Sequence, residues 1–122
     1  MTVIETEHVV FFDVDETLIF NVGLKYSHPE KLSVVYQGFK SFIVPHNTHI
    51  EALKKHKENG YTVVVWSHGR WGWAEAIVKV LKLQSYVDFV FSKPDFMYDD
   101  AALDDNFMRI WKEDKNNPDN KK

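Results

Sequence analysis

The sequence contains no cysteine, which excludes disulfide bonds, thiolate metal sites and cysteine nucleophiles. Disulfides are typical of secreted proteins, so their absence favours a cytoplasmic location. No apolar run approaches the roughly 20 residues that a membrane-spanning helix requires. Residues 1–8 are too polar to form a secretion signal. We therefore expect a soluble protein without a membrane partner.

A strong charge of either sign is also missing. The 15 lysines and arginines are opposed by 18 aspartates and glutamates, for a formal net charge of −3. This balance argues against a strong general attraction to nucleic acid, although it is compatible with a local basic pocket.

The length and composition that are present are those of one folded domain. The chain has 122 residues, of which 44% are hydrophobic and 15% aromatic, enough to build a core. We predict a single domain over residues 1–112. Residues 113–122 lack any apolar side chain and predict a flexible polar tail.

Four short apolar runs predict strands. They cover His8–Phe12, Tyr61–Trp66, Val87–Phe91 and, more briefly, Phe96–Tyr98. The first three are apolar on both faces, as is typical of buried parallel strands. Each run is followed by polar residues, which would therefore gather at the carboxyl ends of the strands.

In the segments between these strands, apolar residues recur at helical spacing, which predicts helices there. The first helix is predicted to begin with Asn47 or Thr48 as its cap and to end at Gly60. A second helix is predicted over residues 71–83 and a last one over residues 106–112. Trp73 in the second helix is expected to pack in the core.

The segment 18–45, ahead of the first helix, predicts a β-hairpin with its turn at Gln37-Gly38. Strands that alternate with helices predict an α/β fold. We expect a three-layer, Rossmann-like open parallel sheet with helices on both faces. Ligands bind such sheets outside the carboxyl ends of the strands.

Asp13 and Asp15 directly follow the first strand and are expected to point the same way. Two unpaired carboxylates at so short a distance repel one another, and a hard cation such as Mg²⁺ relieves the repulsion. One carboxylate can then attack phosphorus while the other transfers a proton. The alternative interpretation is a solvated turn after a strand.

Other polar residues follow the later strands. Ser67 can donate to a phosphate oxygen, or it can be a simple turn or cap serine. Lys93 can neutralise phosphoryl charge, or it can be a solvated surface lysine. An acidic cluster after the last run either supplies metal ligands or begins a helix. Its members are Asp99, Asp100, Asp104 and Asp105.

Taken in order, these residues resemble the four motifs of the haloacid dehalogenase-like (HAD) superfamily. The similarity extends over residues 9–105. The motif residues are Asp13-Val14-Asp15-Glu16-Thr17, Ser67, Lys93 and Asp99-Asp100 with Asp104. The resemblance implies a HAD-type phosphatase, because the family's dehalogenases lack an aspartate in the place of Asp15.

The resemblance also implies a role for each matching residue. Asp13 would be the nucleophile that forms an aspartyl phosphate, Asp15 the general acid and base, and Thr17 an orienting residue. Ser67 and Lys93 would bind the phosphoryl oxygens.

Mg²⁺ is the cofactor that the resemblance implies. A carboxylate oxygen of Asp13, the carbonyl oxygen of Asp15 and the carboxylate of Asp100 would hold it. Asp99 and Asp104 are the other candidate ligands.

Only 49 residues separate Thr17 from Ser67, too few for the large cap domain of many relatives. We expect a small hairpin flap over residues 18–45 and an open site. Such a site suits a bulky phosphorylated substrate, a nucleotide or a nucleic-acid end; a homo-oligomer that covers a small substrate is left open. Residues of the loop after Ser67 are candidate contacts to phosphate or substrate: His68, Arg70 and Trp71.

Two alternatives belong to other functional classes. A catalytically silent HAD fold could act as a binding module, since a fold does not guarantee activity. A phosphoacceptor receiver domain has similar residues, but its acidic pair precedes the lysine. Here Asp99 and Asp100 follow Lys93, which favours the Mg²⁺-dependent phosphomonoester hydrolase.

Overall fold

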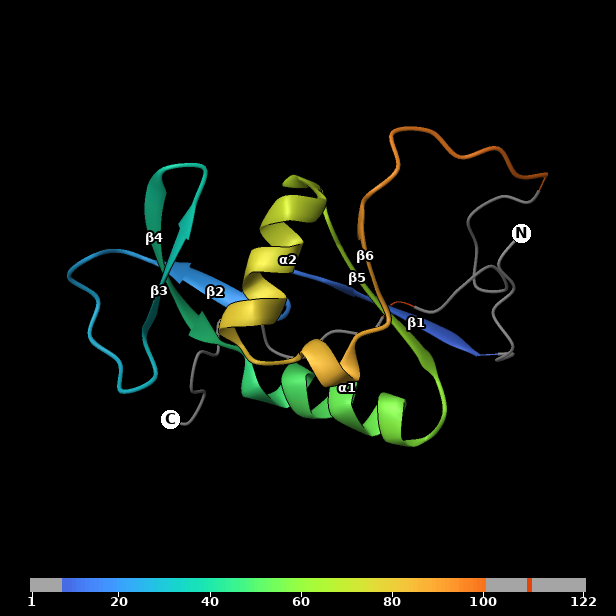
Figure 1. Cartoon of the computed structure of the whole chain (residues 1–122), viewed down its shortest axis with the longest axis horizontal. Coiled ribbons are helices and arrows are strands. Elements are labelled where there is room, and N and C mark those ends of the chain that lie inside the picture. Colours follow the sequence, from blue (N-terminus) through green and yellow to red (C-terminus); the bar gives the residue numbers. More distant parts are fainter. Residues whose placement is uncertain (1–7, 101–109, 111–122) are drawn as a thin grey trace.

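The computed structural model describes residues 8–100 and residue 110 of the chain. Figure 1 shows the arrangement of its elements. In chain order they are β1 (Val9–Asp13), β2 (Ile19–Val22), β3 (Leu32–Tyr36), β4 (Phe39–Pro45), α1 (Asn47–Glu58), β5 (Thr62–Ser67), α2 (Arg70–Val80), the 3₁₀ helix η1 (Gln84–Tyr86) and β6 (Phe89–Ser92). No helix in this part is long and apolar enough to cross a membrane. The helix predicted over 106–112 and the tail predicted over 113–122 lie outside the described residues.

A parallel sheet of three strands forms the centre of the fold. Its strand order is β1-β5-β6, and Phe12, Val65 and Val90 are neighbours across it. All three strands are rich in β-branched and aromatic residues, which favour a pleated, half-buried surface. This sheet and the helices packed on it confirm the α/β class and are compatible with a Rossmann-like arrangement.

The segment between β1 and α1 forms a second, antiparallel sheet in the order β2-β4-β3. β3 and β4 make the predicted hairpin, with Tyr36 opposite Phe39. The turn residues Gln37 and Gly38 have φ values of 52° and 82°, as a two-residue hairpin turn requires. β2 was not predicted, because a run of four residues is too short to indicate a strand without knowledge of its partner.

Both described α-helices pack on the same face of the parallel sheet, so of the helices predicted for both faces, residues 8–100 show those of one face only. Side chains alternate along a strand, and Phe12, Val63 and Val65 share one face. They form a single buried cluster with Leu53 of α1 and Ile77 of α2. The cause is topological: two right-handed crossovers that add strands in one direction leave both helices on one side.

The opposite face of the parallel sheet carries no helix in the described part of the chain. Phe11 and Phe91 are 43% and 45% exposed there, and the centroid of the Phe11 ring lies 4.3 Å from that of Trp66. Parallel sheets usually have both faces covered. On this side the described sheet presents an aromatic surface.

Helix α1 is capped by His46, which corrects the prediction of Asn47 or Thr48. The Nδ1 of His46 accepts a hydrogen bond from the backbone N–H of His49 at 3.3 Å. His46 is fully buried, and its ring stacks on that of His49 with centroids 4.0 Å apart. Short polar residues are the favoured helix caps. The sequence pattern therefore did not indicate His46, whose capping role depends on tertiary packing. Gly60, with a φ of 90°, ends the helix as predicted.

The run Phe96–Tyr98 does not form the fourth predicted strand. It lies in an extended segment without regular structure beyond β6 (Figure 1, orange). Phe96 and Tyr98 are 85% and 97% exposed. A strand needs a neighbour for its backbone hydrogen bonds, and three apolar residues carry no information about whether one is within reach.

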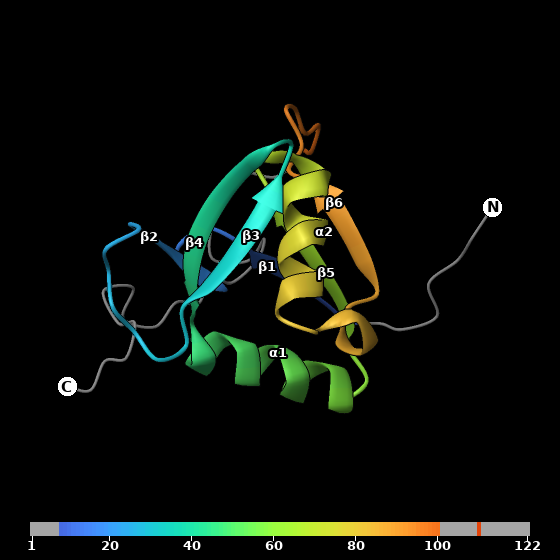
Figure 2. The ribbon, with the colours of Figure 1, turned by 60° about the vertical axis from the view of Figure 1, so that its left-hand side comes forward.

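The hairpin is attached to α2. Figure 2 shows α2 standing between the hairpin β3–β4 and the strands β5 and β6. Val34 of β3 is buried in the same cluster as Ala74 and Ile77 of α2. The hairpin is therefore part of the packed domain.

Candidate functional site

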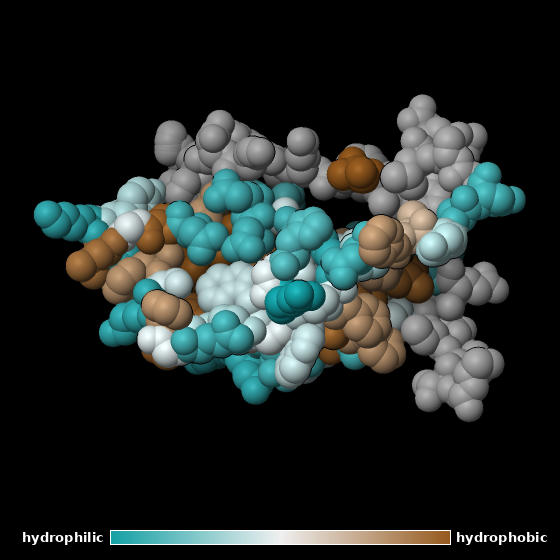
Figure 3. All heavy atoms as spheres, turned by 90° about the horizontal axis from the view of Figure 1, so that it is seen from above, coloured by the Kyte–Doolittle hydropathy of each residue, from teal (hydrophilic) through white to brown (hydrophobic). Residues whose placement is uncertain are grey.

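The carboxyl ends of β1, β5 and β6 meet at one edge of the parallel sheet, because the three strands run in the same direction. They place Asp13, Ser67 and Lys93 at that edge, as the strand pattern predicts. The backbone N–H of Lys93 donates to the carbonyl oxygen of Ser67 at 3.0 Å, so the ends of β5 and β6 stay paired at the edge. Figure 3 views this end of the molecule and shows polar side chains across its middle.

A cation and a hydroxyl hold the carboxylate of Asp13. Lys93 Nζ lies 3.0 Å from Asp13 Oδ1, and Thr17 Oγ1 donates to Asp13 Oδ2 at 3.0 Å. Lys93 reaches Asp13 past Trp66 of the strand between them, with Nζ 6.0 Å from the ring centroid. The Lys93 and Asp13 side chains stay partly exposed, at 22% and 34%. The expected nucleophile, cation and orienting threonine therefore form one connected group that solvent can reach.

The loop after β1 fixes the position of Thr17. Its backbone N–H donates to the carbonyl oxygen of Val14 at 3.1 Å, and Glu16 adopts a φ of 65° to close the turn. The carbonyl oxygen of Thr17 lies 2.8 Å from Nδ1 of His49 on α1. A carbonyl oxygen only accepts, so this nitrogen carries a hydrogen and donates it. His49 thus holds Thr17 where its hydroxyl reaches Asp13.

Asp15 receives two hydrogen bonds on a single carboxylate oxygen. Its Oδ1 accepts from Nδ2 of Asn21 on β2 at 2.9 Å and from the indole Nε1 of Trp73 on α2 at 3.2 Å. The Trp73 ring packs against the core as predicted, but its N–H has this second, unpredicted contact. No local pattern could have indicated it, because 58 positions separate Trp73 from Asp15.

Ser67 is almost completely buried, with 1% of its surface exposed. Its Oγ accepts a hydrogen bond from the backbone N–H of Gly69 at 2.8 Å, which leaves the hydroxyl hydrogen available to donate. A Cβ at Gly69 would lie 3.2 Å from this oxygen and 3.1 Å from Cδ1 of Trp73. The serine is therefore covered by a glycine, at a position where a larger side chain would crowd Ser67 and Trp73.

The candidate contact residues that follow Ser67 are exposed. His68 lies in the turn after β5, and Arg70 begins α2 with a φ of 82°. Trp71 is 57% exposed, and its backbone N–H donates to Oγ of Ser92 at 2.9 Å. This bond ties the first turn of α2 to the end of β6. All three side chains are therefore exposed to solvent, and among the described contacts none of them bonds to Asp13 or Asp15.

The described residues contain no group of three or more histidine, aspartate or glutamate side chains that could hold a metal ion. Asp99 and Asp100 lie in the exposed segment after β6, and they do not join Asp13 and Asp15. Asp104 lies outside the described residues. Carboxylate oxygens are donors that Mg²⁺ prefers, so the donor type fits. The resemblance assigns the carboxylate of Asp100 to the metal, together with Asp13 and the carbonyl oxygen of Asp15, but Asp100 does not form such a group with these two residues.

No protein-family model matches the chain, and none of the curated proteins matches it.

Proposed function

We propose that this chain is a phosphohydrolase that works through an aspartyl-phosphate intermediate. More narrowly, we propose a HAD-type phosphomonoester hydrolase. The observation that carries the proposal is the group formed by Asp13, Thr17 and Lys93. It is an oriented carboxylate beside a lysine, at the edge of a parallel sheet where α/β folds bind ligands.

The first half-reaction transfers the phosphoryl group to Asp13. One carboxylate oxygen attacks the phosphorus, and the bond from phosphorus to the leaving oxygen breaks. Asp15 gives its proton to that oxygen, so the product leaves as an alcohol. Asp15 is then a carboxylate and Asp13 carries the phosphoryl group.

The second half-reaction restores the site. Asp15 takes a proton from water, and the water oxygen attacks the phosphorus. The bond between phosphorus and Asp13 breaks, which releases inorganic phosphate. Asp15 ends with the proton that it had at the start, so the cycle needs no further reactant.

Lys93 and Ser67 are the groups that offset the charge of the transferring phosphoryl group. The ammonium group of Lys93, next to Asp13, can turn from the carboxylate to the phosphoryl oxygens. The Ser67 hydroxyl can donate its hydrogen to another of them. Contacts of this kind each contribute about 100- to 1,000-fold to turnover. Mg²⁺, when bound, would neutralise further charge on these oxygens.

An uncapped site favours a bulky phosphorylated substrate. Residues 18–45 hold only β2, the hairpin and their loops, and the hairpin packs on α2. No cap domain lies over the edge in the described part of the chain. The exposed Arg70 and Trp71 beside it suit a phosphate ester with an aromatic group, such as a nucleotide or a nucleic-acid end.

The test is hydrolysis of 4-nitrophenyl phosphate with Mg²⁺, comparing the wild type with Asp13→Asn and Asp15→Asn. Both variants should lose activity by about 100-fold or more, and Glu75→Gln on the exposed side of α2 should keep it. Mass spectrometry should find a phosphorylated intermediate in Asp15→Asn and none in Asp13→Asn. A wild type that binds Mg²⁺ but hydrolyses no phosphate ester would contradict the proposal.

Two observations favour a second candidate, a silent binding module. Both oxygens of Asp13 already have partners, and no third acidic side chain joins it in the described residues. Such a module would bind phosphate esters without turnover. Calorimetry with a non-hydrolysable phosphonate, beside the activity assay, separates the two functions.

A further inference from the structure

Asp15, the general acid and base of the proposed function, has two carboxylate oxygens in different surroundings. Oδ1 accepts from Asn21 at 2.9 Å and from Trp73 at 3.2 Å. Oδ2 has no hydrogen-bond partner in the part of the chain that the structure describes. Both donors are neutral, and they come from two elements that the sequence gives no reason to connect.

The geometry points to Asn21 and Trp73 as positioning residues that reserve Oδ2 of Asp15 for proton transfer. This inference rests on the proposed function. The indole N–H of Trp73 can only donate, and the Asn21 amide donates through Nδ2. A proton on Oδ1 would use part of that oxygen's acceptor capacity and displace at least one of the two hydrogen bonds, whereas a proton on Oδ2 leaves both intact. The acid form of Asp15 therefore carries its hydrogen on Oδ2, the oxygen that Asn21 and Trp73 leave unbonded.

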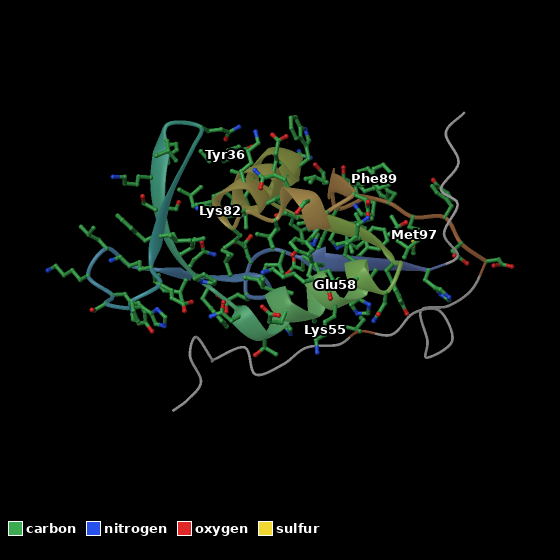
Figure 4. All side chains as sticks on the ribbon, turned by 60° about the horizontal axis from the view of Figure 1, so that its bottom comes forward. Tyr36, Lys55, Glu58, Lys82, Phe89 and Met97 are labelled. Atoms are coloured by element: carbon green, nitrogen blue, oxygen red, sulfur yellow. The ribbon has the colours of Figure 1, made fainter. Side chains whose placement is uncertain are left out.

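The indole of Trp73 is well placed to fix this orientation because its own position is fixed. Its ring packs against the core cluster and contacts the ring of Tyr36, with centroids 5.9 Å apart and planes inclined at 53°. Figure 4 shows Tyr36 on the hairpin, beside α2. On the other side, Cδ1 of Trp73 lies against Gly69. A donor held from both sides has little freedom to follow Asp15, so Asp15 must follow it.

This arrangement gives the hairpin a role in the reaction. Tyr36 of β3 supports Trp73, Trp73 holds Asp15, and β2 in the same antiparallel sheet supplies Asn21. The antiparallel sheet therefore contributes orientation to the acid and base, in addition to its place beside the site.

The test compares two substrates in Trp73→Phe and Asn21→Ala. Phenyl phosphate has a poor leaving group that needs a proton, whereas 4-nitrophenyl phosphate has a good one that needs little help. We expect kcat/KM for phenyl phosphate to fall roughly 10- to 100-fold in each variant, a part of what general acid catalysis supplies. With 4-nitrophenyl phosphate the decrease should be only a few-fold, and KM should change little for either substrate.

A matched control is Asn47→Ala, which removes an exposed amide that donates to Glu30 at 2.8 Å. It should leave both rates unchanged. Trp73→Phe keeps the aromatic packing and loses the N–H, and circular dichroism would check that it folds. Asn21 is exposed, so Asn21→Ala gives a second reading that does not depend on the core.

Three outcomes would overturn the inference in different ways. An active wild type whose two variants show equal losses on both substrates would assign Asn21 and Trp73 a structural role only. Unchanged rates in both variants, with Asp13→Asn inactive, would overturn the inference and leave the proposed function standing. A wild type without phosphatase activity would overturn both.

Discussion

The hydroxyl of Tyr36 on the hairpin lies directly against the backbone of Gly72 on α2. A Cβ at position 72 would collide with the Tyr36 hydroxyl oxygen and would stand 3.0 and 3.1 Å from Cε1 and Cζ of the same ring. The hairpin and α2 are therefore in contact over a spot where only glycine leaves room. The glycine costs helix stability, and its position explains why it is there.

The first prediction follows from that contact. Gly72→Ala should lower the free energy of unfolding by up to about 2 kcal/mol, because overpacking against the Tyr36 ring outweighs the gain of about 1 kcal/mol in helix propensity. Urea unfolding measures the change. In a Tyr36→Ala background the same substitution should instead stabilise the protein. Gly23→Ala, where nothing lies within 4 Å, should show no packing penalty.

A second prediction concerns the ion pair of Lys93 with Asp13. Lys93→Ala should reduce kcat/KM for phosphate esters by roughly 100-fold, since it removes one group that offsets phosphoryl charge. Lys93→Arg should recover part of the loss. Lys79→Ala is the matched control, because Lys79 is 61% exposed and reaches Glu75 only at 3.9 Å. An unchanged rate in Lys93→Ala would remove this lysine from the site.

A third prediction concerns His49 beneath the loop. His49→Leu should cost about 1–3 kcal/mol of unfolding free energy, because it leaves the Thr17 carbonyl without its 2.8 Å donor. Turnover should fall as well, since Thr17 orients Asp13. His49→Asn, which keeps a donor, should lose less on both measures. Chemical denaturation and steady-state assays of the two variants decide the point.

A fourth prediction uses the pH dependence of stability. Burial acts to raise the pKa of Asp88, but hydrogen bonds from Lys57 and the Val63 N–H, with the charge of Lys57, outweigh it and lower the pKa below its ordinary value of 3.8. The stabilisation is therefore complete above pH 3.8 and is lost as the pH falls through the lower folded value. Asp88→Asn should be less stable than the wild type at pH 6 and close to it at strongly acid pH.

The control for this prediction is Glu51→Gln on the exposed side of α1, whose effect should not vary in this way. Unfolding midpoints measured from pH 2 to pH 7 test both variants. A difference between wild type and Asp88→Asn that stays constant over that range would contradict the assigned ion pair.

The residues that could be placed from the sequence are those set by strand direction. Asp13 and Lys93 end different strands, and the parallel order of those strands is what brings them within 3.0 Å. The hairpin could likewise be located from Gln37-Gly38, because that turn needs two residues at positive φ. The local sequence was sufficient to place the hairpin turn and the polar residues at the strand ends.

What could not be predicted depends on contacts between distant segments. Trp73 is predicted to be a core residue, because helical spacing indicates which face of a helix is apolar. It does not indicate where an indole N–H points. The second predicted helix, over 71–83, ends earlier, at Val80, since Lys82 takes a φ of 59°. The shared face of both helices depends on strand order, which no single segment encodes.

The two glycines at the start of α2 form a sequence pattern by which the fold can be recognised. Gly69 faces Ser67 and Trp73, whereas Gly72 faces Tyr36, so different neighbours restrict each position. Chains that descend from the same ancestor and keep these glycine contacts should retain Gly-x-x-Gly-Trp after the serine of β5, even where their surface residues have diverged. That spacing, joined to Asp-x-Asp-x-Thr near the start of the chain, offers a pattern for recognising distant kin.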